Sequence, residues 1–142
     1  MAVATMIALM ARATKKPTDD AVERLRQICL ALPGAEEKPF GGHTAPAFRV
    51  RDKLFVMTSE DGTTMNCKGA PGVQQALVSS DPGKFFVPRY TGKNGWVGAR
   101  LDVAQDWDEI AELVEESWRR TAPKKLVAQL ASAAAPGRRE KA

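Results

Sequence analysis

The chain has 142 residues, of which 44% are hydrophobic and 27% are charged. This length and composition are those of one ordinary globular domain that buries a core without disulfide staples. The net charge of +4 lies at the ends of the chain, because residues 1–17 contribute +3 and residues 137–142 contribute +2, which leaves −1 for the rest. The overall basicity is therefore weak evidence for a nucleic-acid partner.

Residues 1–17 hold a short apolar run with three cationic residues after it. A secretory signal peptide carries its positive charges before the apolar run, and this run is too short to span a bilayer. We therefore expect a disordered or weakly helical leader and no membrane partner. A mitochondrial-type presequence is the alternative.

The first predicted helix begins at Thr18, which can cap it, with Asp19 and Asp20 favourably placed in the first turn. Hydrophobic residues recur at helical spacing until Pro33-Gly34 ends the helix. A loop rich in glycine and proline, GAEEKPFGGHTAP, is expected to follow.

Three strands are predicted next, as an antiparallel meander. In residues 48–51, two hydrophobic residues alternate with Arg49 and Arg51, which is the period of a half-buried strand. Turns at Asp52-Lys53 and at EDGT separate this strand from those expected over residues 54–58 and 63–68.

A short helix over residues 69–80 and two further strands within residues 85–102 continue the pattern. The clearest helix runs from Trp107 to Arg120, where one stripe is hydrophobic and the acids lie elsewhere. The stripe consists of Trp107, Ile110, Leu113, Val114, Ser117 and Trp118. A short basic helix over residues 123–130 and a disordered tail over residues 131–142 complete the chain.

The order α-β-β-β-α-β-β-α predicts an α+β domain over residues 18–130. We expect a roughly five-stranded antiparallel sheet with helices packed on one face. The other face is then available to water or to a ligand.

The stretch FFVPRYTGKNGWVGARLD, residues 85–102, combines aromatic and cationic residues and has no acid until Asp102. Asn94-Gly95 predicts a two-residue hairpin turn, because a type I′ turn needs positive φ at both positions. A loop with an odd number of residues would turn Arg89 toward the core. That arrangement is disfavoured because burying the charge of Arg89 costs free energy. One predicted face, with a gap at Gly98, carries Arg89, Lys93, Trp96 and Arg100. The core face carries Phe86, Pro88, Tyr90, Val97, Ala99 and Leu101.

This exposed face suits nucleic acid, because cations contact phosphates and an indole stacks on or between bases. The predicted DNA-binding residues are Arg89, Lys93, Trp96 and Arg100, helped by Arg49, Arg51 and Lys53. One alternative is an ordinary sheet face on which arginine stems cover Trp96. Another is a protein-interaction surface that meets an acidic partner, such as the acidic helix of a second copy.

Residues for catalysis are sparse. His43 is the sole histidine, which excludes metal sites built on a histidine pair. It could pair with Cys67, but Cys67 lies in a predicted strand far along the sequence. Cys29 and Cys67 lie in no ligand-like spacing, which predicts free, buried thiols in a cytoplasmic protein. We expect no metal, no cofactor and no enzyme activity. An enzyme acting on a small anion is the least favoured interpretation.

Five segments, in this order, resemble the MmcQ/YjbR-like family of small bacterial proteins: LPGAEEKPFG, FRVRDKLFVM, CKGAP, FVPRYTGKNGWVGARLD and ESWRRTAPKKL. The resemblance covers residues 18 to about 130. It implies a compact fold like that of bacterial frataxin, together with the double-wing DNA-binding role commonly assigned to the family. The resemblance does not extend to iron binding, because the acidic helix of this chain lies toward the C-terminus. Such proteins usually have a glycine where this chain has Asp52, which places an acid near any phosphate that this hairpin contacts.

Overall fold

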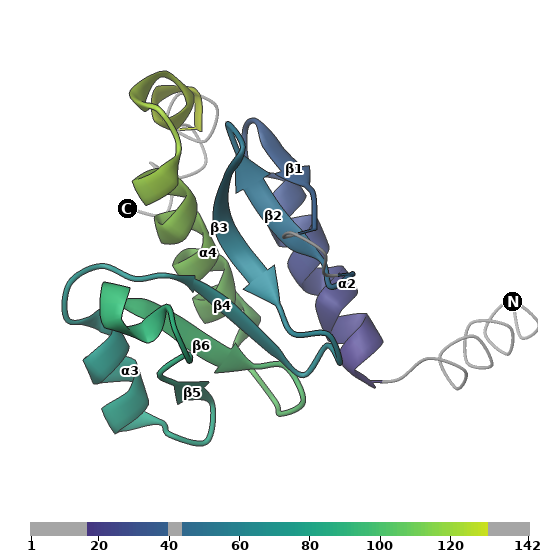
Figure 1. The fold of residues 1–142 in the computed structure, drawn as a ribbon, viewed down its shortest axis with the longest axis vertical. Helices are drawn as coiled ribbons and strands as arrows, with labels where there is room; N and C mark the ends of the chain where they lie inside the picture. The colour runs from purple at the N-terminus through teal and green to yellow at the C-terminus, as the bar shows by residue number, and fades with distance from the viewer. Residues whose placement is uncertain (1–16, 40–43, 131–142) are drawn as a thin grey trace, which may run out of the picture.

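A six-stranded antiparallel sheet organises the computed structural model, which describes residues 17–39 and 44–130 (Figure 1). The strands lie in the order β1-β2-β3-β4-β6-β5. They are β1 (Ala35–Glu37), β2 (Ala47–Val50), β3 (Lys53–Thr58), β4 (Thr64–Lys68), β5 (Phe85–Phe86) and β6 (Trp96–Arg100). The helices are α2 (Pro17–Leu30), α3 (Val73–Ser80) and α4 (Trp107–Thr121), and residues 124–130 are also helical.

Helices α2 and α4 contact each other and lie behind the sheet in Figure 1, while α3 packs against β5 and β6. The predicted α+β fold, an antiparallel sheet with helices packed on it, is confirmed. Helix α2 begins at Pro17, one residue before the predicted cap, because the fixed φ of proline suits a first helical turn. The rest of the predicted leader, the predicted tail over residues 131–142 and His43 lie outside the described residues.

The sheet has one strand more than predicted. Strand β1 forms within the segment expected to be a loop, and it pairs with β2 along the sheet edge. It has three residues, two of them exposed glutamates, and so shows none of the alternation that reveals a strand in a sequence.

A side chain from α4 bridges an irregularity in the sheet. The register between β2 and β3 shifts, which leaves Phe55 as the extra residue of a β-bulge. Continuing the register between β3 and β4 places Phe55 opposite Lys68. The buried Ser117 hydroxyl donates to the Phe55 carbonyl oxygen at 2.5 Å and accepts from the Lys68 backbone N–H at 2.9 Å. Ser117 therefore joins β3 and β4 at the bulge.

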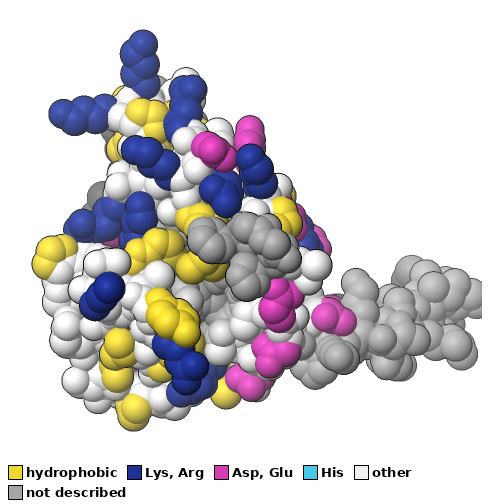
Figure 2. All heavy atoms as spheres, viewed as in Figure 1, with side chains coloured by type: hydrophobic (Ala, Val, Ile, Leu, Met, Phe, Trp, Pro, Cys, Tyr) yellow, Lys and Arg dark blue, Asp and Glu magenta, His cyan; other side chains and the backbone are white. Residues whose placement is uncertain are grey.

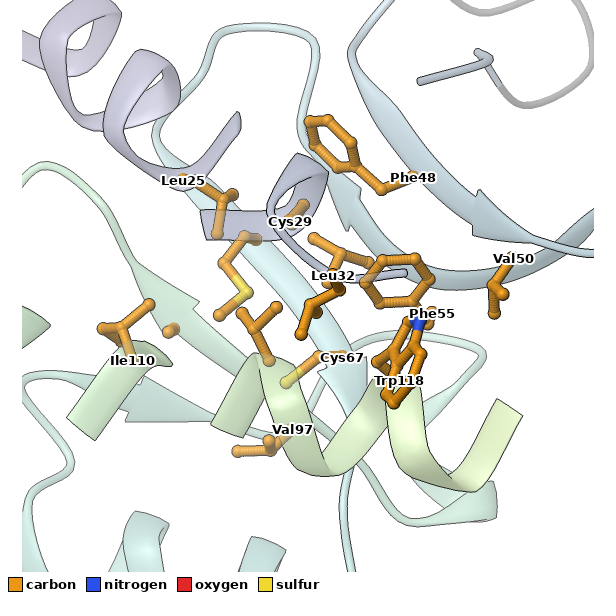
Figure 3. Close-up of a cluster of buried hydrophobic side chains, with 14 of the residues drawn as sticks. Leu25, Cys29, Leu32, Phe48, Val50, Phe55, Cys67, Val97, Ile110 and Trp118 are labelled. Carbon is orange, nitrogen blue, oxygen red and sulfur yellow. The ribbon is translucent and has the colours of Figure 1, made fainter. Parts of the chain in front are cut away.

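The core lies between the sheet and the predicted stripe of α4 (Figure 3). Ile110, Val114 and Trp118 are fully buried, which confirms that stripe. The Trp118 indole N–H donates to the Pro33 carbonyl oxygen at 3.0 Å and so ties α4 to the end of α2. The Asp106 side chain caps α4 by accepting hydrogen bonds from two backbone N–H groups.

Cys29 and Cys67 are buried, free thiols, as predicted (Figure 3). Burial raises the pKa of Cys67 to about 12. Burial, with smaller contributions from Cys67 and Glu37, raises the pKa of Cys29 well above its ordinary value. Both side chains therefore stay protonated at neutral pH, where a nucleophile or a metal ligand would need the thiolate.

These raised pKa values predict a loss of stability at alkaline pH. The unfolded chain releases both thiol protons above about pH 8.5, whereas the folded chain retains them, so unfolding releases protons there. The free energy of unfolding should fall by about 1.4 kcal/mol per pH unit for each thiol, from about pH 9 up to the folded pKa of about 12 for Cys67. Denaturant titrations across this range check the slope. The Cys29→Ala/Cys67→Ala variant should lack the thiol contribution, and an equal slope in both proteins would contradict the prediction.

Candidate nucleic-acid interface

The side of the sheet turned away from α2 and α4 carries a row of residues that crosses four strands. Met57, Asn66, Gly98 and Phe86 are paired neighbours on β3, β4, β6 and β5. Because side chains alternate along a strand, this row points away from the buried core residues on either side of it. We call this side the open face, and Figures 1 and 2 look onto it.

A groove of about 700 Å³ runs over the open face. Its lining is mostly hydrophobic, and its volume is that of a typical ligand site. The lining residues are Ala45, Ala47, Leu54, Met57, Thr58, Ser59, Glu60, Thr64, Asn66, Phe86, Pro88, Arg89, Tyr90, Thr91 and Trp96.

Phe86 contributes to the groove by lying across Gly98. A Cβ atom at position 98 would lie within 2.7 Å of three atoms of the Phe86 ring, so the ring fills the space that a side chain would take. The guanidinium carbon of Arg100 lies 5.0 Å from the centroid of the same ring, in a cation–π contact. The sequence interpretation left a gap at Gly98 and turned Phe86 toward the core. Both points are wrong, because Phe86 pairs with Gly98 and shares its face.

The connection between β5 and β6 runs over residues 87–95 and is not the tight turn predicted at Asn94-Gly95. Gly92–Asn94 form the 3-10 turn η1, and of the two predicted turn residues only Gly95 has a positive φ, of 86°. The buried Gln74 side chain of α3 holds both ends of this turn. Its Nε2 donates to the Gly92 carbonyl oxygen at 2.7 Å and to the Trp96 carbonyl oxygen at 2.6 Å.

The open face is most basic at the end that carries the turn between β2 and β3. Lys68 is paired with Trp96 there, and its pKa is lowered by burial and, to a smaller extent, by the charge of nearby Lys53. Figure 2 shows lysine and arginine side chains gathered toward this end and acidic side chains nearer the turn between β3 and β4. At that acidic end, Glu60 accepts hydrogen bonds from the Thr44 backbone N–H at 3.2 Å and the Thr44 hydroxyl at 2.7 Å.

The turn between β2 and β3 is itself a two-residue turn with positive φ at Arg51 (52°) and Asp52 (65°). The side chain of Arg49 is 15% exposed and donates to the backbone carbonyls of Asp52 at 3.1 Å and Lys38 at 3.4 Å. The Asp52 carboxylate lies 3.4 Å from Lys38 Nζ and 3.8 Å from Arg49 Nη1. Arg49 is thus committed to the turn, while Arg51 and Lys53 stay exposed.

Two buried polar atoms on the groove lining lack a hydrogen-bond partner within the described part of the chain. They are Asn66 Oδ1 and Thr91 Oγ1. Most buried polar atoms in folded proteins are paired, so these two are exceptions to the usual pattern.

The predicted site residues are distributed over several positions. Arg89 and Trp96 line the groove, Arg100 stacks on Phe86, and Lys53 lies at the basic end. Lys93 is exposed on η1, outside the strands of the sheet. Arg89 lies in the loop between β5 and β6 and not on a strand, since β5 ends at Phe86.

The sequence interpretation missed Phe86, Tyr90, Asn66 and Lys68 as groove or rim residues. A signal existed for two of them. Strand β4 alternates, with Met65 and Cys67 buried, so Asn66 and Lys68 must face the other way. No comparable signal existed for Phe86, because its neighbour Phe85 is also aromatic and is the one that is buried.

Among the described residues, no three histidine, cysteine, aspartate or glutamate side chains lie close enough together to hold a metal ion. In the same part of the chain, no helix has both the length and the hydrophobicity needed to cross a membrane.

Comparisons with known proteins agree with this fold. The model of the YjbR family matches residues 30–120. The crystal structure of Deinococcus radiodurans protein DR2400, with a DUF419 domain, is similar at a TM-score of 0.62 and 22% identity, covering 68% of this chain and 75% of that chain. No curated protein matches. The family match spans well over half of the chain and includes every residue that lines the groove, so the resemblance seen in the sequence is confirmed and the chain belongs to the YjbR family.

Proposed function

We propose that this protein is a non-enzymatic nucleic-acid-binding domain that holds a single strand of DNA across its open face. The observation that supports this is the hydrophobic groove with aromatic side chains, Tyr90 and Trp96 among them, beside the cations Arg89, Lys53 and Lys68. Proteins that bind single strands combine these two features, because bases stack on aromatic faces while cations contact phosphates.

The shape of the open face favours a single strand over a duplex. The strands β5 and β6 do not form a regular two-stranded ribbon that could enter a groove of the duplex, because β5 has two residues and a long loop follows it. A concave hydrophobic surface also has nothing to contact on the phosphate exterior of a duplex, whereas unstacked bases of a single strand can fill it. The backbone of the strand would follow the basic end, away from Glu60.

This proposal predicts a change in salt dependence when two exposed cations are removed. Each phosphate contact on a single strand contributes a slope of about −0.7 in the plot of log K against log salt. Arg89→Ala/Lys53→Ala should therefore flatten the slope by about 1.4 and weaken binding to all sequences alike. Fluorescence anisotropy with the full chain at several salt concentrations measures it. The basic ends of the chain are the same in both proteins, so their contribution to the slope cancels in the comparison.

Arg24→Ala/Arg120→Ala removes equal charge from α2 and α4, on the far side of the sheet, and should leave the slope nearly unchanged. Equal slopes for the native chain and the Arg89→Ala/Lys53→Ala variant would overturn the proposed interface.

A protein-interaction domain is the second candidate. Tyr90 is 82% exposed and Val87 is 54% exposed on the same loop, and such side chains also serve as anchors for a protein partner. In that case the full chain would bind no single strand at physiological salt, and an acidic protein surface would be the ligand of the basic end.

A further inference from the structure

We infer that Tyr90 is a pre-set stacking platform for one base of a bound single strand, and that the strained backbone at this position serves to present its ring. The inference rests on the proposed function, because it assigns one base of the strand to one side chain. It goes further by separating Tyr90 from Phe86 and Trp96, the groove aromatics that belong to strands of the sheet.

The backbone at Tyr90 has a conformation that tyrosine rarely adopts. Its φ is 68°, and the Thr91 backbone N–H donates to the Arg89 carbonyl oxygen at 2.8 Å. A hydrogen bond that spans one residue with positive φ makes the rarer and more strained kind of γ-turn. A positive φ brings the Cβ of a bulky residue too close to the backbone, which costs free energy, whereas glycine has no Cβ and escapes the penalty.

The chain on both sides of this turn is held in place. Pro88 is buried, and its carbonyl oxygen accepts a hydrogen bond from the Gly92 backbone N–H at 3.0 Å. The Gly92 carbonyl oxygen in turn accepts from Gln74 Nε2 at 2.7 Å. The surrounding structure thus imposes the strained conformation on Tyr90. Strain that is imposed in this way is concentrated in folded proteins at sites that hold ligands.

The side chain of Tyr90 gives the folded chain little stability in return. The residue is 82% exposed, more than any other large hydrophobic residue that the structure describes, so its ring buries little surface in the fold. If the fold alone decided position 90, glycine or asparagine would suit the positive φ better. A bulky aromatic residue at a strained and exposed position is explained by a ligand that its ring contacts.

The surroundings of the ring indicate the chemistry of that ligand. Tyr90 lines the groove together with Arg89, the residue before it. An aromatic face stacks on a flat base, and a guanidinium beside it contacts a phosphate of the same strand. Because every base has a flat face, the contact should require a base without selecting one sequence.

The test compares two ligands of the full chain, a thymidine strand of about ten nucleotides and an abasic strand of equal length. Tyr90→Ala should weaken binding of the thymidine strand by roughly fivefold or more, as the loss of one stacked base does. Tyr90→Leu should also weaken it, because leucine is hydrophobic but not flat. Tyr90→Phe keeps the aromatic face and should bind as the native chain does. All three variants should bind the abasic strand with native affinity, since it has no base to stack.

The melting temperature tests the strain separately from the binding. Tyr90→Gly and Tyr90→Ala remove the same ring, but only glycine is free of the penalty at positive φ. Tyr90→Gly should therefore melt above Tyr90→Ala, by roughly 2–8 °C, while both lose affinity for the thymidine strand. Leu30→Ala shortens an exposed hydrophobic side chain on α2, on the far side of the sheet, and should change neither affinity.

The outcomes separate this inference from the proposed function. If the native chain binds the thymidine strand and Tyr90→Ala or Tyr90→Leu binds it equally well, the ring is not a stacking platform, and the proposed strand binding stands. An equal loss of affinity for the abasic strand, or a Tyr90→Gly variant that melts below Tyr90→Ala, would overturn the inference in the same way. If the native chain binds neither strand at physiological salt, the proposed function fails and the inference fails with it.

Discussion

Ser117→Ala is expected to lower the free energy of unfolding by about 2–5 kcal/mol, because it removes the hydroxyl that joins β3 to β4 at the bulge. The change leaves the Phe55 carbonyl and the Lys68 N–H without the partner that Ser117 provides. Each unpaired buried backbone group costs about 1–3 kcal/mol. Ser117 is fully buried, and the space left by one oxygen atom is too small to admit a bridging water. The loss would be a large share of the roughly 5–15 kcal/mol that holds a typical domain together.

Denaturant unfolding of Ser117→Ala and of Ser79→Ala measures this. Ser79 is exposed on α3, so its replacement should change the stability by less than about 0.5 kcal/mol. A similarly small effect at Ser117 would mean that the two backbone groups find other partners. The Ser117 hydrogen bonds across the bulge would then contribute nothing to the free energy of unfolding.

The helices and the central strands could be predicted because their signals are local. The stripe of α4 recurs every three or four residues, and the alternation in β2 through β4 recurs every second residue, so each can be recognised within a short window. Ser117 belonged to the predicted stripe, yet its role could not be predicted. Its partners lie far away in the sequence, and the bulge that needs it arises only when β2 and β3 pair.

The tight turn was assigned to the wrong hairpin. Asn94-Gly95 has the preferred residues, yet the two-residue turn with positive φ lies at Arg51-Asp52, where neither residue is glycine. A two-residue connection between antiparallel strands favours positive φ at both positions, and Arg51 and Asp52 adopt it. Between β5 and β6 the Gln74 amide holds the chain in a 3-10 turn, and this tertiary contact overrides the local preference.

That error determined which faces were assigned in residues 85–102. The prediction rejected an odd loop, because in a continuous strand it would have buried Arg89. The strand instead ends at Phe86, so Arg89 lies on an exposed loop and the burial cost never arises. The cost of burying a charge can assign a face only to a residue that lies in the strand. The residue at which a strand ends is difficult to predict from sequence.

Gly98→Ala is expected to lower the free energy of unfolding by about 1–3 kcal/mol, as overpacking in a well-filled site does. The added Cβ would lie within 2.7 Å of three atoms of the Phe86 ring, so the ring must leave its place. Its displacement also breaks the cation–π contact with Arg100 and removes part of the groove. Affinity for the thymidine strand should fall by about tenfold, since stacking is worth about 1–3 kcal/mol per base.

The decisive measurement is the effect of Gly98→Ala on the free energy of unfolding in a chain that lacks the Phe86 ring. In Phe86→Ala the clash is gone, and alanine is better than glycine within a strand by about 0.5–1 kcal/mol, so Gly98→Ala should there leave stability unchanged or raise it. Unfolding of the four proteins gives a coupling energy between positions 86 and 98, expected at about 1–3 kcal/mol. Gly83→Ala is the matched control, because its Cβ would meet only Asp81 Oδ1, at 3.6 Å. If Gly98→Ala destabilises both backgrounds equally, the strand requires this glycine for a reason other than the ring that covers it.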